Sequence, residues 1–292
     1  MSTRRQPPTV RLRRLGKELR DLRAAAGLTQ EEVQERVGVD RGTLIQIEQA
    51  KRAPQRRTLT ALLNLYDVTD PDRRAELTEL SKRVPQPGWL QRYGAGLPAS
   101  EQYMTYVMYE AEAALVRNYE SLFVPGLLQT RNYASAVVAG VLPLASPEEV
   151  HDRVQVRIKR QHLLSRDAPL QLHAIIDEAA LRRLVGGPLV MREQCQALLL
   201  ATEQNNVTVQ VIPFTEGAHP GMPGSFVIMD FPEPGDPPLV YLDSMAGDLF
   251  LDKGEDVERY ALTFEHLQAL ALPPTDSATL IATHAHTAKK GS

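Results

Sequence analysis

Residues 28–48, LTQEEVQERVGVDRGTLIQIE, decide the fold of the first part of this chain. Thr29 and Glu32, three residues apart, form a capping box and predict the start of a helix. Gly38 permits a tight turn, and Asp40 can cap a second helix with apolar residues on its inner face. Two short helices joined across one glycine turn predict a helix-turn-helix, the geometry that places a helix in the major groove of DNA.

The sequence on either side of this stretch predicts further helices. Leucines at steps of three and four in residues 12–26 predict an amphipathic helix, which Gly27 ends. Residues 70–84 predict one more charged helix, and Pro85-Gln86-Pro87-Gly88 breaks it. We therefore expect a helix-turn-helix domain with its connector helix over residues 1–84, and a second domain over residues 85–292.

Charge is distributed unevenly between these two parts. Residues 1–84 contain 18 Lys and Arg against 12 Asp and Glu, while the rest contains 15 against 24. A basic head on an acidic body is typical of a protein that reads DNA with one part only. A solvated basic tail would also produce part of this imbalance, because residues 4–14 supply five of the positive charges.

The ordered pattern over residues 12–66 resembles the XRE (lambda-repressor-like) family of helix-turn-helix regulators. The resemblance is carried by residues 28–33, 38–44 and 47–54 together. It implies DNA binding and an internal pair between Arg23 and Glu48. The family usually has glycine just after the recognition helix, where this chain has Ala50. A left-handed backbone at a non-glycine residue costs about 1 kcal/mol.

This resemblance assigns DNA contacts to specific side chains. Arg41 can pair with a guanine edge and Gln46 with an adenine edge, while Thr43 can reach a thymine methyl or a phosphate. Gly42 allows close approach of the backbone. Phosphates would meet the start of the helix at residues 30–37 and the loop after the recognition helix. The predicted DNA-binding residues are Thr29, Gln30, Arg41, Gly42, Thr43, Gln46, Lys51, Arg52 and Arg56. The alternative is a small helical bundle that binds protein.

The second domain mixes helices with strands. Alternating or continuous apolar runs predict strands at residues 114–124, 170–176, 207–213, 226–231 and 239–242. The fold class expected is therefore α+β, with an all-α lambda-repressor-like helix-turn-helix head followed by an α+β regulatory domain whose sheet is mixed or antiparallel. A helix is expected over residues 127–139, after a turn at Pro125-Gly126.

Residues 90–283 resemble an uncharacterised domain that follows the helix-turn-helix head in regulators of filamentous actinobacteria, including those of the WhiJ type. The similar segments are Val124-Pro125-Gly126-Leu127-Leu128-Gln129-Thr130 with Tyr133, Arg157 with Arg160-Gln161, residues 177–182, 211–213 and 224–226. The resemblance implies a regulatory module of unknown ligand. It also implies a protein partner, a small acidic protein of the BldB-like type encoded nearby.

The segment after Pro125 has two interpretations. In one, Gln129, Thr130, Arg131 and Tyr133 line a groove for a ligand or partner. In the other, the segment is a tight turn and a helix start, with its leucines in the core. Both interpretations remain open at the level of sequence.

Motifs for catalysis and metal binding are not apparent in the sequence. There is no phosphate-binding loop, nucleophile elbow or zinc pattern, and Cys195 is the single cysteine. A catalytic triad can be drawn only from scattered residues, namely Ser244, His219 or His266, and Asp243. We expect no catalytic residues, no metal and no cofactor. No apolar run is long enough to span a bilayer and no secretory signal opens the chain, so we expect no membrane association and a cytoplasmic protein.

Three functions remain in competition. The first is a transcriptional regulator that binds double-stranded DNA as a homodimer and whose second domain senses a ligand or a protein partner. The second is an antitoxin-like autoregulator that sequesters a small neighbouring protein. The third is an enzyme fused to a DNA-binding head.

Overall fold

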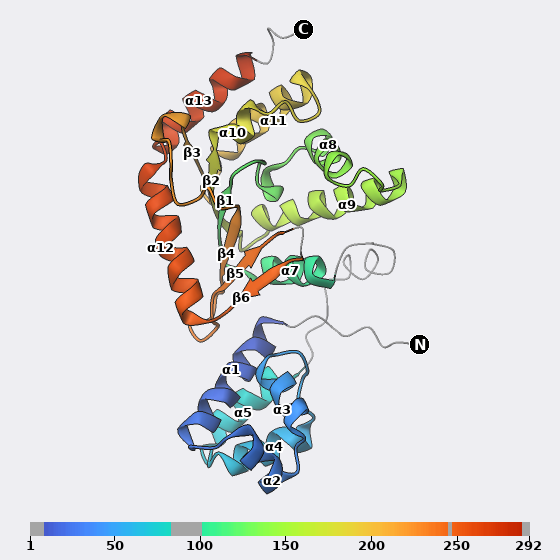
Figure 1. The fold of residues 1–292 in the computed structure, drawn as a ribbon, viewed down its shortest axis with the longest axis vertical. Helices are drawn as coiled ribbons and strands as arrows, with labels where there is room; N and C mark the ends of the chain where they lie inside the picture. Colours follow the sequence, from blue (N-terminus) through green and yellow to red (C-terminus); the bar gives the residue numbers. More distant parts are fainter. Residues whose placement is uncertain (1–8, 83–100, 245–246, 288–292) are drawn as a thin grey trace. The chain divides into compact units, whose positions relative to one another are not determined.

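The computed structural model describes residues 9–82, 101–244 and 247–287 (Figure 1). The chain divides into two compact units, residues 1–86 with 231–237 and residues 87–230 with 238–292. The predicted break at residues 85–88 lies outside the described residues. No helix in the described segments is both long enough and apolar enough to cross a membrane.

The first unit is all-helical. Its helices are α1 (Val10–Ala25), α2 (Gln30–Val37), α3 (Arg41–Glu48), α4 (Arg56–Leu65) and α5 (Pro71–Leu80). The predicted caps are present: Thr29 and Glu32 form the capping box of α2, and the Asp40 side chain accepts from the Thr43 N–H at 2.9 Å. Gly38 is left-handed, with φ 68°, and makes the turn between α2 and α3. Local sequence chemistry therefore sets these helix starts.

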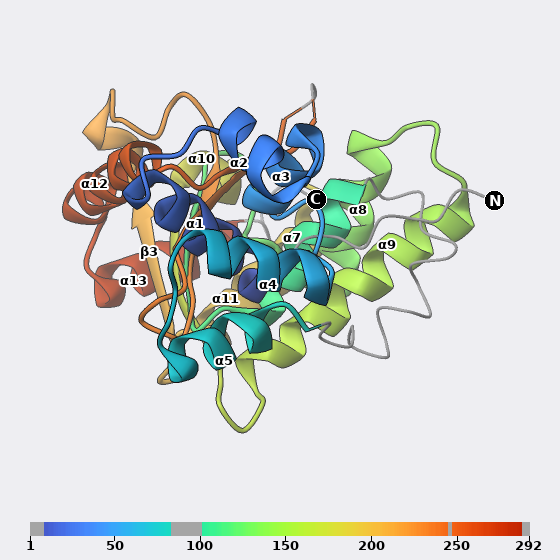
Figure 2. The same ribbon diagram turned by 90° about the horizontal axis from the view of Figure 1, so that it is seen from below.

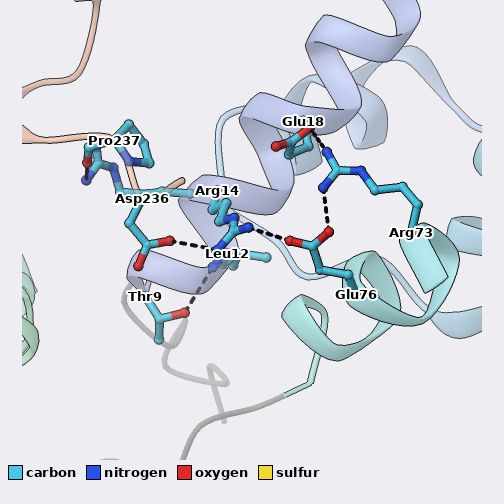
Figure 3. A network of polar contacts seen from close by, with 9 residues as sticks. Thr9, Leu12, Arg14, Glu18, Arg73, Glu76, Asp236 and Pro237 are labelled. Atoms are coloured by element: carbon cyan, nitrogen blue, oxygen red, sulfur yellow. Dashed lines mark hydrogen bonds and ion pairs between the residues drawn. The ribbon is translucent and has the colours of Figure 1, made fainter. Parts of the chain in front are cut away.

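Two kinds of contact hold the helices of the first unit together. The leucines predicted on α1 pack into one apolar core with buried residues of the other four helices. A polar network also joins α1 to α5 (Figure 3). In it, Arg73 donates to Glu18 and Glu76, and Glu76 also accepts from Arg14. Since these side chains are partly exposed, the apolar core supplies most of the stability and the network fixes the position of α5.

The second unit is built on a six-stranded mixed sheet. The strands are β1 (Leu115–Glu120), β2 (Gln171–Asp177), β3 (Val207–Ile212), β4 (Phe226–Asp230), β5 (Leu239–Leu242) and β6 (Leu249–Leu251). They lie in the order β3-β2-β1-β4-β5-β6. β1, β2 and β3 are parallel, whereas β4, β5 and β6 continue the sheet antiparallel. The predicted α+β class and mixed sheet are confirmed, and β6 is an addition.

Helices cover both faces of this sheet (Figures 1 and 2). On one face lies α12 (Gly254–Leu270), whose Phe264 and Leu267 join the core formed by Tyr119 and Phe226. On the other face lie α7 (Glu101–Glu112), α8 (Arg131–Val141) and α9 (Pro147–Arg160), with α10 (Glu178–Arg182) and α11 (Pro188–Ala201) farther along. The last helix, α13 (Pro274–Thr287), packs against β3 and α11.

One predicted helix starts later than expected. The helix expected over residues 127–139 is wrong in its first turn, because residues 126–128 form a single 3-10 turn and α8 begins at Arg131. The Thr130 hydroxyl accepts from the Tyr133 N–H and so marks the start of α8. The segment from Pro125 to Thr130 is therefore a compact loop between β1 and α8.

Candidate functional site

The predicted recognition helix is α3. Arg41 and Gly42 are exposed and Thr43 and Gln46 partly exposed, whereas Leu44, Ile47 and Glu48 are buried. The three predicted base readers, Arg41, Thr43 and Gln46, therefore lie along the solvent side of one helix, together with Gly42. This arrangement is the one required for a helix that enters the major groove.

Arg41 is held only weakly by its neighbours. Its guanidinium lies 3.0 Å from Glu31, and both side chains are more than half exposed. Exposed pairs of this kind contribute about 0–1 kcal/mol. Arg41 can therefore exchange this carboxylate for a guanine edge at small cost.

The inner end of α3 is fixed by a buried ion pair. Arg23 of α1 donates to both oxygens of Glu48, at 2.6 and 3.0 Å, and also to the carbonyl oxygen of Leu28. The hydrogen bond to Glu48 raises the pKa of Arg23 above its ordinary value. The pairing implied by the XRE resemblance is present, and it leaves Glu48 no role in reading bases.

Gln30 joins this pair. Its side-chain amide donates to Glu48 at 2.9 Å, so the side chain lies against α3. The predicted phosphate contact at this position would come from the backbone N–H at the start of α2. Gln30 therefore connects the phosphate-facing end of α2 with the helix that reads bases.

The loop after α3 contains the left-handed backbone conformation that the family usually assigns to glycine. Ala50 has φ 56°, its N–H donates to Ile47, and the N–H of Lys51 donates to the carbonyl oxygen of Gln46 at 2.8 Å. These two bonds are the Schellman pattern that ends helices. Ala50 is buried, so its methyl group offsets part of the strain. The missing glycine does not change the path of the loop.

Sequence reasoning missed Gly16. A Cβ at Gly16 of α1 would lie 2.8 Å from the carbonyl oxygens of Ile47 and Glu48. Only glycine allows α1 to approach α3 this closely, so Gly16 sets where the recognition helix lies. Helical periodicity treats this position as neutral and gives no signal for it.

The cations that would contact phosphate lie just beyond α3. Lys51, Arg52 and Arg56 are exposed, and within the described ranges no salt bridge engages them. Arg57, which was not predicted, is also exposed in the first turn of α4. No side chain caps that helix, so its first N–H groups are open to an anion.

The second unit contains a cavity of about 410 Å³. Its floor is the sheet face opposite α12, and α7, α8 and α9 supply its walls. The cavity lies where β1 ends at Glu120 and β4 begins at Phe226. The strand order reverses at this point, because β2 lies on one side of β1 and β4 on the other. The carboxyl end of the parallel strand β1 faces the cavity, and ligands of open α/β sheets bind outside such strand ends, whereas β4 runs antiparallel and begins here.

Gln129 lies in the wall of this cavity and holds the loop between β1 and α8. Its amide donates to the carbonyl oxygen of Val124 at 2.7 Å, and its amide oxygen accepts from Arg157 at 2.9 Å. Its own carbonyl oxygen accepts from Gln161 at 2.6 Å. Segments similar to the uncharacterised domain, more than thirty residues apart, therefore meet at one residue.

The other three residues predicted in that segment do not line the cavity. Thr130 caps α8, and its N–H donates to Gln194. Tyr133 is fully buried, and its hydroxyl accepts from the Val124 N–H. Arg131 is exposed on the surface of α8. The structure thus brings only Gln129 to a place where a small molecule could touch it.

A buried ion pair supports one wall of the cavity. Arg160 of α9 donates to both oxygens of Glu110 of α7, each at 2.6 Å. The hydroxyls of Tyr103 and Tyr106 accept from the same guanidinium. Arg160 is 4% exposed and Glu110 is fully buried, so this cluster ties α9 to α7 in a nonpolar environment.

Two further charged groups face the cavity. Arg157 donates to Gln129, but its Nε is buried and has no hydrogen-bond partner among the residues that the structure describes. Glu120, at the end of β1, is partly exposed through the cavity. Desolvation raises the pKa of Glu120 to about 7, although hydrogen bonds with Ser225 and Asn118 act in the opposite direction.

Replacing Glu120 by glutamine is expected to stabilise the protein at alkaline pH. A carboxyl whose pKa is raised in the folded state destabilises that state as pH rises from the ordinary pKa of 4.5 to about 7. Glu120→Gln removes this penalty, which we expect to be about 1–2 kcal/mol at pH 8 because cavity water screens the charge. Below pH 4 the variant and the parent should be equally stable.

Urea unfolding at several pH values measures this difference. Glu203→Gln, at an exposed position on the same unit, is the matched control and should leave the pH dependence unchanged. A Glu120→Gln variant with the parent's pH dependence would show that Glu120 keeps an ordinary pKa.

The triad that can be drawn from the sequence is not assembled. His219 lies 3.1 Å from Asp177, and its other ring nitrogen accepts from the Gly221 N–H. The Ser244 hydroxyl donates to the Gly247 carbonyl oxygen. Both nitrogens of His219 are therefore engaged in holding a loop. No group of three or more potential metal ligands occurs among the described residues.

Comparison with known proteins gives two matches. Residues 103–283 match the family described as a domain of unknown function (DUF5753), and residues 14–77 match a helix-turn-helix domain. No curated protein and no solved structure matches the chain. The first match covers more than half of the chain and includes every residue that lines the cavity. The second covers α3 with the predicted base readers.

Proposed function

This chain belongs to the DUF5753 family, and from that starting point we propose that it is a sequence-specific, DNA-binding transcriptional regulator of the XRE type. The proposal rests on the exposed side chains of α3 and on the ion pair that holds this helix in place. Its outer side presents Arg41, Thr43 and Gln46, while Arg23 and Glu48 fix its inner end. Direct reading of base edges requires a rigidly held helix whose outer side chains end in polar groups.

We further propose that the protein binds DNA as a homodimer. One helix-turn-helix domain contacts a half-site of only a few base pairs, and such domains gain affinity and specificity by pairing. The second unit would then control when the head binds, through a ligand or a partner protein, and would act by binding and not by catalysis. The engagement of both His219 nitrogens supports a structural role for that residue.

Selection of binding sites from a random duplex library tests the proposal. The full chain is incubated with random 30-base-pair duplexes, and bound DNA is recovered and sequenced. We expect enrichment of an approximately palindromic sequence with half-site centres about 10 base pairs apart. Recovery without enrichment of any sequence would contradict sequence-specific binding. Enrichment of a single half-site would contradict the dimer alone.

A further inference from the structure

We infer that the cavity of the second unit binds a small organic acid with an apolar body, whose acid group pairs with Arg157. This inference deepens the proposed function, because it names the chemical class of the ligand that would control DNA binding. The binding itself does not depend on DNA.

The size and composition of the cavity favour a small molecule. A volume of about 410 Å³ lies within the range of roughly 300–1,000 Å³ usual for small-molecule sites. Apolar residues of α8, the preceding loop and the sheet line much of it, namely Phe123, Val124, Val137, Val138, Val141, Leu142 and Val227. A peptide or nucleic acid strand would not fit such a space, whereas a ring system or a short acyl chain would.

Arg157 is the cation best placed for an anionic ligand. Arg153 is paired with Glu149 at 3.1 Å, and Arg160 is neutralised by Glu110. Arg157 is bound only to the neutral side chain of Gln129, and its Nε is buried without a partner in the described part of the chain. Arg157 lines the cavity, and no salt bridge among the described residues neutralises its charge, so an anionic ligand there would gain a charge-assisted hydrogen bond from its guanidinium.

The acidic side chains of the cavity do not supply this acceptor. Within the described ranges no ion pair joins Arg157 to Glu120, although both line the same space. Asp243 follows β5 at the end that lies beside the start of β4, and desolvation, together with the charge and hydrogen bond of Asp248, raises the pKa of Asp243. These carboxyls therefore compete weakly for Arg157, and Glu120 in its protonated form can donate a hydrogen bond to a ligand.

The place of the cavity in the fold is an independent argument. It opens at the end of β1, where the strand order reverses, and the loop held by Gln129 forms part of its wall. That loop starts at Val124 and leads directly into α8. A ligand bound to Arg157 would thus lie close to Gln129, whose hydrogen bonds join this loop to α9.

Two fluorescent probes with a similar apolar body test the inference. 8-Anilinonaphthalene-1-sulfonate carries an acid group, and N-phenyl-1-naphthylamine does not. We expect the full chain to bind the sulfonate at least tenfold more tightly than the neutral probe. Arg157→Gln should weaken sulfonate binding about tenfold and change binding of the neutral probe less than twofold.

Two further variants serve as controls. Arg131→Gln removes an exposed arginine of α8 that does not line the cavity, and it should bind both probes as the parent does. Val141→Trp places a large side chain at the solvent-exposed rim of the cavity and should weaken binding of both probes. Thermal unfolding of each variant confirms that it is folded before probe binding is compared.

Three results would overturn the inference: equal sulfonate binding by Arg157→Gln and the parent, equal binding of both probes by the parent, or stronger competition by 1-naphthylmethylamine than by 1-naphthoate. The last would indicate a cationic ligand held by the acidic groups. Each result leaves the enrichment of DNA sites unaffected, so failure here is separable from failure of the proposed function.

Discussion

Replacing Glu110 by glutamine is expected to lower the free energy of unfolding by about 3–5 kcal/mol, since it leaves a buried arginine without its counter-charge. Arg160 would keep only neutral acceptors, which are the amide oxygen that remains at position 110 and the hydroxyls of Tyr103 and Tyr106. Urea unfolding of the full chain, followed by circular dichroism, measures the loss.

A partly exposed pair provides the matched control. Glu149 and Arg153 lie on the same helix as Arg160, and about a quarter of each side chain is exposed. Glu149→Gln should therefore cost less than about 1 kcal/mol. The double variant Glu110→Leu, Arg160→Met should recover much of the loss, because no charge is left buried. Equal effects of Glu110→Gln and Glu149→Gln would show that the buried pair has no special role.

Replacing Arg41 by alanine is expected to weaken binding to the selected DNA site by about 1–3 kcal/mol per half-site. The loss falls on base reading, so binding to unrelated duplexes should weaken much less. Fluorescence anisotropy with the selected duplex and a scrambled duplex at fixed salt gives both affinities. Removal of Arg41 also breaks its pair with Glu31, but both groups are exposed and stability should change by under about 1 kcal/mol.

Arg20→Ala is the control for charge. Arg20 is exposed on α1, so its replacement by alanine removes the same charge from a position outside the recognition helix. We expect it to weaken binding to both duplexes equally and only slightly. If Arg41→Ala behaves as Arg20→Ala does, the recognition helix has been assigned wrongly.

The sequence allowed the first unit to be predicted because its signals are local. Thr29 with Glu32, Gly38 and Asp40 each act within one helical turn, and each acts in the structure as its chemistry requires. The role of Gly16 could not be predicted in this way. It depends on how closely α1 approaches the end of α3, which no spacing within α1 reveals.

For the second unit, the fold class could be predicted from the sequence, whereas the shortest strand and the cavity could not. The strands of four or more residues showed alternating or continuous apolar runs, but β6 has three residues and is too short for a pattern to appear. The cavity could not be predicted, because Glu120, Arg157 and Asp243 come from distant segments that meet only through the sheet order. Lining a groove was one of two interpretations of Gln129, and neither of them predicted its hydrogen bonds to Val124, Arg157 and Gln161, which only the structure shows.

The most direct test of the central claim, that α3 reads base edges, is a change of specificity at Gln46. Site selection is repeated with the full chain carrying Gln46→Arg. Glutamine prefers adenine and arginine prefers guanine, so we predict that one position in each half-site changes from A·T to G·C while the others stay the same. Enrichment of the parent's sequence, unchanged at every position, would contradict the claim that this side chain reads DNA.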